Sequence, residues 1–170
     1  MIPTLFESNR LTFRSAETYF NNMPKQIISY VGLLLTDNVL KTLPQNWQAA
    51  SQTGSEEKWL VEQLNASLLI TIECKKSLDI IGFIFIHPDN KNAQIGYLLG
   101  EPYWHKGYGS EALEALVQYY QKSGVIKVLH AGVSAEHFAS IKLLEKVGFT
   151  RVEADCNNSN NVMYMLTISK

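Results

Sequence analysis

The most informative stretch of the sequence connects a predicted strand to a predicted helix. It reads Gly100-Glu101-Pro102-Tyr103-Trp104-His105-Lys106-Gly107-Tyr108-Gly109-Ser110-Glu111-Ala112. Gly107 and Gly109 lack Cβ atoms where the chain must turn, so backbone N–H groups can approach a ligand closely. The helix that follows adds its unpaired N–H groups and the positive end of its dipole. A phosphate or pyrophosphate group fits such a place, and His105 and Lys106 offer side-chain donors.

Two other interpretations fit parts of this loop. A Gly-x-Gly sequence before a helix is often only a turn, so the loop by itself leaves phosphate binding and a plain turn open. The spacing from Gly107 to Ala112 also matches the dinucleotide fingerprint of a Rossmann fold. That fingerprint directly follows its strand and has an acidic residue about 20 residues further on. Here residues 100–106 intervene and residues 128–131 hold no acid, which disfavours a nucleotide-binding domain.

The sequence around the loop predicts an alternation of strands and helices. Strands are predicted where apolar residues alternate or run together: 10–14, 67–73, 79–86, 93–99, 125–133, 151–154 and 162–168. Helices are predicted where apolar residues recur every three or four positions: 16–43, broken near Pro24 and ended by Pro44; a segment capped by Thr53 or Ser55 and running to Asn65; 110–122; and 139–146. Turn formers predict a loop at 45–54 and a hairpin at 87–92. This order predicts an α/β (α+β) fold with a mixed sheet and helices on both faces.

Composition bounds the function. The 170 residues suit a single domain covering 1–170. A net charge of −1 and a pI near 6.4 give no global attraction to nucleic acid or to a membrane surface. Cys74 and Cys156 lack the spacing of a zinc or redox motif, so we expect reduced thiols, no metal and a cytoplasmic location. The N-terminus does not look like a signal peptide, and the apolar run 27–35 is too short to span a bilayer.

Three motifs together resemble the GNAT superfamily of acetyltransferases, and within it the RimJ/RimL-like group that acetylates ribosomal-protein N-termini. They are the loop 104–109, the preceding Ile95-Gly96-Tyr97-Leu98-Leu99, and His137-Phe138-Ala139-Ser140 followed by Glu145-Lys146-Val147-Gly148-Phe149. The resemblance is strong from about Ile80 to Phe149. Three positions depart from the general pattern: Trp104 replaces Gln or Arg, His137 replaces Asn, and Leu144 replaces a Tyr.

The resemblance implies a GNAT fold and acetyl-CoA as co-substrate. The fold is a mostly antiparallel seven-stranded sheet whose fourth and fifth strands, ending near Leu99 and Val133, splay apart. The backbone of 97–99 is expected to pair with pantetheine, the N–H of Leu99 to face the thioester oxygen, and the N–H groups of 105–110 to hold the pyrophosphate. His137 and Ser140 are expected along the pantetheine and thiol end. The predicted cofactor-binding residues are therefore Tyr97, Leu98, Leu99, Trp104, His105, Lys106, Gly107, Tyr108, Gly109, Ser110, His137 and Ser140.

The implied reaction transfers an acetyl group to a primary amine, such as the N-terminus of a ribosomal or other protein. Ser140 is the candidate general acid, the alternative being a simple contact with the cofactor. Glu101, His130, His87 and Glu111 are candidate bases, each with a structural explanation, and the sequence selects none of them. A small-molecule or antibiotic amine and a non-catalytic acetyl-CoA-binding module are alternatives. Acceptor specificity is expected in 16–65 and in the Asn157–Asn161 loop, and the protein is expected to be a monomer or a homodimer.

We expect that replacing Gly107 or Gly109 with Glu abolishes acetyl-CoA binding while the fold is kept, because a carboxylate side chain fills and repels the predicted phosphate site. Calorimetric titration with acetyl-CoA measures the affinity, and circular dichroism checks the fold. Unchanged affinity in both variants would refute a phosphate site in this loop.

Overall fold

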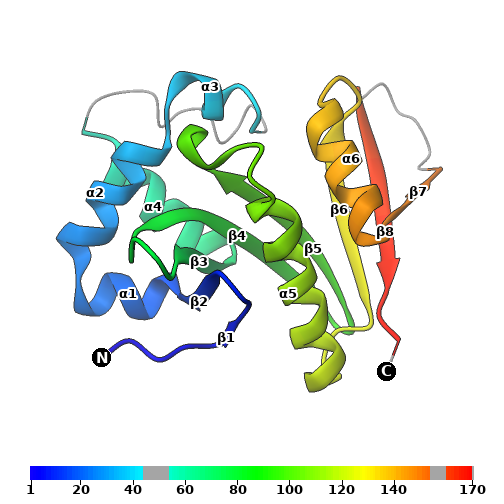
Figure 1. The fold of residues 1–170 in the computed structure, drawn as a ribbon, viewed down its shortest axis with the longest axis horizontal. Coiled ribbons are helices and arrows are strands. Elements are labelled where there is room, and N and C mark those ends of the chain that lie inside the picture. The colour runs from blue at the N-terminus through cyan, green and yellow to red at the C-terminus, as the bar shows by residue number, and fades with distance from the viewer. Residues whose placement is uncertain (44–53, 154–159, 170) are drawn as a thin grey trace. The chain divides into compact units, whose positions relative to one another are not determined.

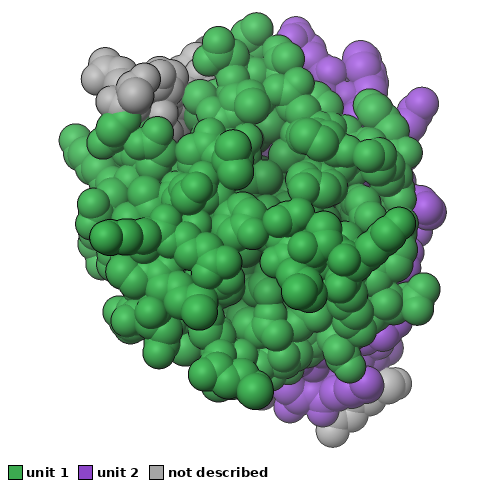
Figure 2. All heavy atoms as spheres, turned by 60° about the vertical axis from the view of Figure 1, so that its left-hand side comes forward, with its two compact units in different colours: residues 1–85, 97–108 green, residues 86–96, 109–170 purple. Residues whose placement is uncertain are grey.

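The computed structural model describes residues 1–43, 54–153 and 160–169, which form two compact units (Figure 1). Unit 1 comprises residues 1–85 and 97–108, and unit 2 comprises residues 86–96 and 109–170. Figure 2 shows their atoms in green and purple. Strands β4 (Ile80–Asp89) and β5 (Asn92–Leu99) contribute residues to both units. The predicted end of a helix at Pro44, the cap Thr53, the loop residues 45–53 and Cys156 lie outside the described residues.

The strands of unit 1 are β1 (Phe6–Glu7), β2 (Leu11–Ser15) and β3 (Leu68–Cys74), followed in the sheet by β4 and β5. Strand β2 is antiparallel to both β1 and β3. The described sheet strands number eight, one more than the seven predicted. The additional strand β1 has two residues, too few to show an alternating pattern. It is held by the rings of Phe6 and Phe13, which stack with centroids 4.4 Å apart.

The helices of unit 1 follow from local signals in the sequence. The hydroxyl of Ser15 accepts a hydrogen bond from the N–H of Thr18 at 3.2 Å and so caps α1 (Ala16–Asn22). Pro24 opens α2 (Pro24–Leu34), a position where its missing N–H is not needed. Helices α3 (Asp37–Leu40) and α4 (Glu56–Ala66) complete the unit, with Ser55 as the N-cap residue of α4. The predicted break near Pro24 is confirmed.

The core of unit 1 is built around the indole ring of Trp59. Its ring lies 6.3 Å from that of Phe83 and 6.1 Å from that of Phe85, centroid to centroid, and all three side chains are buried. Ile27 and Val31 of α2 belong to the same cluster. Burying each large apolar side chain contributes on the order of 1.5–3 kcal/mol, and edge-on aromatic pairs add about 0.5–1.5 kcal/mol. These contacts join α2 and α4 to strand β4.

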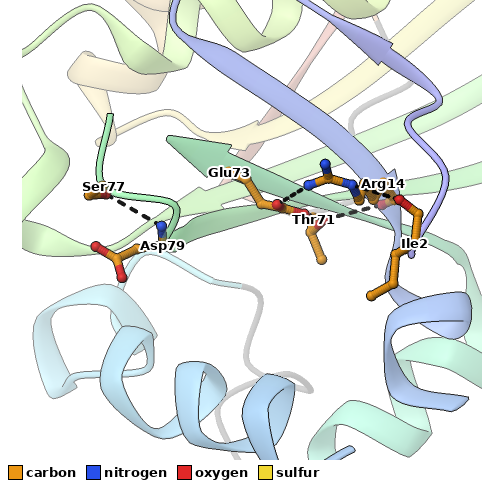
Figure 3. Close-up of polar contacts among 6 residues, drawn as sticks. All are labelled: Ile2, Arg14, Thr71, Glu73, Ser77 and Asp79. Carbon is orange, nitrogen blue, oxygen red and sulfur yellow. Dashed lines mark hydrogen bonds and ion pairs between the residues drawn. The ribbon is translucent and has the colours of Figure 1, made fainter. Parts of the chain in front are cut away.

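A polar network lies between β2 and β3 (Figure 3). The guanidinium of Arg14 forms an ion pair with the carboxylate of Glu73 and donates from Nε to the carbonyl of Ile2 at 3.0 Å. The hydroxyl of Thr71 donates to Glu73 at 2.9 Å. Glu73 is only 6% exposed, and burial raises the pKa of its carboxyl against the opposing bonds from Thr71 and Arg14. The network fixes the N-terminal segment on the sheet.

Unit 2 contains the remaining strands β6 (Val128–Ser134), β7 (Thr150–Val152) and β8 (Asn161–Thr167), in the order β5-β6-β8-β7. Strand β6 is parallel to β5 and antiparallel to β8. The β5–β6 ladder runs from Asn92 and Val128 to Ile95 and Ala131, so it covers only the first four of the seven residues of β6. This short ladder agrees with the implied divergence of these two strands.

The helices of unit 2 are α5 (Tyr108–Ser123) and α6 (Phe138–Val147). The predicted stripe of α5 is buried at Ala112, Leu113, Leu116 and Tyr120. Two boundaries differ from prediction. Helix α5 begins at Tyr108 rather than Ser110, and β4 extends to Asp89 because the hairpin needs only Asn90 and Lys91. Asn90 has a φ of 54°, which Asn tolerates in a two-residue turn. None of the helices in the described ranges is long and apolar enough to cross a membrane.

We expect Gly82→Ala to lower the free energy of unfolding by about 1–3 kcal/mol or more, the usual effect of overpacking. A Cβ at Gly82 would lie 2.2 Å from the carbonyl oxygen of Leu98, so the backbone of β4 or β5 must move. Denaturant unfolding measures the change.

The matched control is Gly32→Ala in the interior of α2. Its Cβ would meet only the flexible side chain of Glu56, at 3.4 Å, so the variant should gain about 0.5–1 kcal/mol from helix propensity. Equal stabilities for the two variants would contradict the close approach of β4 and β5.

Candidate active site

The predicted phosphate loop is a short 3₁₀ helix, η2 (Glu101–Tyr103), followed by a turn at residues 104–107 and then by α5. The φ angles of His105 and Gly107 are 57° and 78°, and that of Lys106 is not positive. Alternation of left- and right-handed residues turns successive N–H groups toward one side and makes an anion-binding concavity. Gly107 thus lies where the chain turns, as predicted. Gly109 does not, because it is a buried residue of the first turn of α5.

This geometry fits a phosphate group. The turn residues His105, Lys106 and Gly107 are exposed, so the concavity is accessible. The first turn of α5, at 108–110, adds main-chain N–H groups that point out of the start of the helix. The helix has 16 residues, and its dipole favours an anion at this end. A diphosphate can therefore be held by main-chain groups here.

The peptide group between Leu99 and Gly100 is fixed at both ends. The indole N–H of Trp104 donates to the carbonyl of Leu99 at 2.7 Å, and the N–H of Gly100 donates to the carbonyl of Ile81 at 2.9 Å. Trp104, a predicted cofactor contact, thus closes the chain from β5 into η2. The Gly100 N–H is also occupied.

The side chain of Lys106 folds back on the loop. Its ammonium donates to the carbonyl of Pro102 at 2.6 Å, from an exposed position. An ammonium has three N–H donors. This one bond therefore keeps the positive charge beside the turn and leaves two donors for other acceptors.

Sequence reasoning missed Arg10, which precedes β2. Its guanidinium donates to the carbonyl of Lys106 at 3.0 Å and lies 4.3 Å from the ring centroid of Tyr108. The two ends of this hydrogen bond are 96 residues apart in the sequence. No local pattern reveals such a contact; an Arg next to a strand is ordinary.

Glu101, a candidate base, joins η2 to the segment between α2 and α3. Its carboxylate accepts hydrogen bonds from the hydroxyl of Thr36 and from the side-chain amide of Asn38, the latter at 3.1 Å. These bonds, first that of Thr36 and then that of Asn38, lower the pKa of the Glu101 carboxyl. Glu101 is therefore a carboxylate at neutral pH and a weak proton acceptor.

The predicted site residues of unit 2 lie at the start of α6. His137 is the N-cap residue of this helix, and its N–H donates to the carbonyl of Ser134 at 2.9 Å. Ser140, partly exposed, follows in the first turn. Burial lowers the pKa of His137 below its ordinary value, so its imidazole is neutral at neutral pH. A neutral imidazole can donate one hydrogen bond and accept another.

Two further positions of unit 2 connect its helices. The ammonium of Lys146 on α6 donates to the hydroxyl of Ser110 on α5 at 3.4 Å, and Ser110 is only 7% exposed. Leu144, at the place of the family Tyr, is 1% exposed and belongs to the core. Of the predicted residues, Tyr97–Tyr108 lie in unit 1 and Gly109, Ser110, His137 and Ser140 in unit 2. The loop at 157–161 lies outside the described residues, apart from Asn160 and Asn161.

Comparison with known proteins defines the class. A family model described as an acetyltransferase (GNAT) domain matches residues 10–150. The chain therefore belongs to the GNAT acetyltransferase family, and the resemblance found in the sequence is confirmed.

Three similar proteins illustrate the relation. The chain is 36% identical over 89 residues to the uncharacterized N-acetyltransferase p20 of Bacillus licheniformis, which is 52% of this chain and 50% of p20. That match spans about half the length of p20. A GNAT-family acetyltransferase from Bacillus anthracis has a TM-score of 0.76 at 20% identity, over 95% of this chain and 97% of that one. RimL, a ribosomal L7/L12 α-N-protein acetyltransferase in complex with coenzyme A, has a TM-score of 0.72 at 23% identity, over 98% and 97%. At these identities the two structures show the shared fold.

We expect the imidazole of His137 to titrate below its ordinary value of about 6.5, because burial disfavours the charged form. A lowered pKa contributes stability above pH 6.5, and this contribution is lost as the pH falls through the lowered value. NMR titration of the ring proton, assigned with His137→Asn, measures the pKa.

The control is the unfolding free energy of the wild type and of His137→Asn at pH 7 and pH 5. The wild type should lose more stability on acidification than the variant. Titration of the His137 ring at or above pH 6.5 would contradict a neutral, half-buried imidazole.

Proposed function

We propose that this protein transfers the acetyl group of acetyl-CoA to the α-amine at the N-terminus of a protein or peptide. The observation that carries the proposal is the turn at 104–107, in which His105 and Gly107 have positive φ angles, directly before a 16-residue helix. The turn lies inside the matched GNAT domain. RimL, which shares the fold, is a ribosomal-protein acetyltransferase and was solved with coenzyme A.

The residues assigned to the cofactor act mainly through the backbone. The N–H groups of 105–110 hold the diphosphate, and the backbone of 97–99 lies along the pantetheine. Trp104 and Lys106 shape the loop. The family resemblance assigns His137 and Ser140 of unit 2 to the thiol end of the cofactor. When bound, acetyl-CoA supplies an activated thioester that a neutral amine can attack to give an amide and a free thiol. The N–H of Leu99 donates to the thioester oxygen, where negative charge develops, and one such donor contributes about 3 kcal/mol.

The proton balance favours an α-amine as acceptor. The nitrogen of the acceptor forms the new C–N bond, the C–S bond breaks, and the proton that the amine loses ends on the thiol. Glu101 is a weak base because its pKa is lowered. An α-amine has a pKa of about 7.7–8.0, so a sizeable fraction is neutral at pH 7.5, whereas a Lys side chain at about 10.4 is almost fully charged. An α-amine therefore needs little help in losing its proton.

The acceptor is assigned to the segment between α2 and α3. Thr36 of this segment and Asn38 of α3 bond to Glu101, which is two residues beyond Leu99. Residues that recognise the acceptor near its reacting amine are therefore expected close to these side chains. The negative charge of Glu101 also attracts an ammonium group before it loses its proton.

The test is release of free thiol from acetyl-CoA, followed with a thiol reagent, across peptides that differ in their N-terminal residue. We expect turnover with free N-termini and none with the same peptides blocked at the N-terminus but carrying a Lys. Mass spectrometry of the product locates the acetyl group. If coenzyme A binds but no amine releases thiol, the protein is a binding module and the proposed transfer is wrong.

The same assay tests Ser140 as the group that protonates the leaving thiolate. Ser140→Ala should lower kcat by about 10²–10⁴-fold, the usual contribution of a general acid, with little change in KM. A raised KM at unchanged kcat would show instead that Ser140 only contacts the cofactor.

A further inference from the structure

Arg10 reaches the turn of the candidate site from the other end of the chain. Its guanidinium donates to the carbonyl of Lys106 at 3.0 Å and stands 4.3 Å from the centre of the Tyr108 ring. Its second terminal nitrogen lies 3.4 Å from where a Cβ would be on Gly107. One side chain therefore touches three consecutive residues of the turn and the start of α5.

The hydrogen bond to Lys106 orients a neighbouring N–H group. The carbonyl of Lys106 and the N–H of Gly107 belong to one planar trans peptide unit, in which the two groups point in opposite directions. A donor that fixes the carbonyl therefore also fixes the direction of the Gly107 N–H. The carbonyl is bound to the guanidinium, and the N–H faces the other way.

The turn needs such support. His105 has a φ of 57°, and a left-handed conformation costs a residue with a Cβ roughly 1–2 kcal/mol. Conformations of this kind persist only where the surrounding structure imposes them. The bond from Arg10 to Lys106 acts on the residue between His105 and Gly107, at the centre of the turn.

Arg10 itself is held in place. Its carbonyl accepts a hydrogen bond from the N–H of Lys75 at 2.9 Å, at the end of β3. Tyr108, under the guanidinium, has its hydroxyl 3.9 Å from the sulfur of Cys74 and its ring edge-on to that of Tyr103, with centroids 6.2 Å apart. Arg10 and Tyr108 are thus both held against the end of β3, through Lys75 and Cys74 of unit 1.

We propose that Arg10 is the positioning residue of the diphosphate-binding turn, setting the direction of its main-chain N–H groups and placing a permanent positive charge behind them. The inference rests on the proposed function in assigning a diphosphate to this turn. It predicts that Arg10 affects how the phosphate end of the cofactor is bound and has no effect on the thioester end.

The experiment compares binding of coenzyme A with binding of pantetheine, which lacks the phosphates, by calorimetry. Arg10→Ala should weaken coenzyme A binding by about 10–100-fold, the effect of losing one charge-assisted hydrogen bond, and leave pantetheine binding unchanged. Arg10→Lys should show an intermediate loss, because an ammonium keeps the charge but lacks the planar fork and stacks less well. Lys58→Ala is the control, because it removes one positive charge from an exposed position on α4 of the same unit. It should bind coenzyme A as the wild type does.

The outcomes separate the two proposals. Equal losses for coenzyme A and pantetheine, or unchanged affinity in Arg10→Ala, would overturn the role of Arg10 while leaving the acetyl transfer untouched. Should Arg10→Ala fail to fold, the selective loss in Arg10→Lys decides in its place. If the wild type binds coenzyme A but releases no thiol with any amine, the proposed acetyl transfer is contradicted and the positioning role of Arg10 is not.

Discussion

The peptide group between Leu99 and Gly100 sets the path of the chain from β5 into α5. Its carbonyl is bound by the indole of Trp104 and its N–H by the carbonyl of Ile81. A Cβ at Gly100 would lie 2.5 Å from the Cδ2 methyl of Leu34, so the end of that side chain would have to move to make room for it. With this peptide fixed, η2 and the turn at 104–107 follow directly after the strand and lead into Tyr108, the first residue of α5.

The side chains of the loop mostly hold its backbone. Trp104 binds Leu99, Lys106 binds Pro102, and the guanidinium of Arg10 binds the carbonyl of Lys106. Under the proposed function, the ligand is then bound by main-chain N–H groups, which every residue type except Pro supplies. This explains how the first place of the loop can hold Trp where the general family pattern has Gln or Arg. A change of side chain there alters how the loop is held, and the N–H groups that it presents stay the same.

Local signals in the sequence predicted local structure. The Ser15 cap, the break at Pro24 and the apolar stripe of α5 were readable because each depends on residues within one or two turns of a helix. The motifs also predicted a turn at Gly107, and the chain turns there with a φ of 78°. The two-residue strand β1 was too short to show an alternating pattern. The turn formers at 87–92 led to a predicted hairpin loop that is longer than the observed one, because β4 continues to Asp89. The contacts of Arg10 with Lys106 and of Glu101 with Thr36 join residues 96 and 65 positions apart, which no window of sequence can reveal.

The replacement of the family Tyr by Leu144 bears on how the thiol leaves. His137, Ser140 and Leu144 lie three and four residues apart, so they follow one face of α6. Leu144 is fully packed in the core of unit 2, whereas His137 and Ser140, nearer the start of the helix, are partly exposed. Ser140 is one turn, or about 6 Å along the helix axis, nearer the N-terminus of α6 than Leu144. Under the proposed function, the proton for the leaving thiolate therefore comes from the open start of α6, at Ser140, because Leu144 offers no hydroxyl.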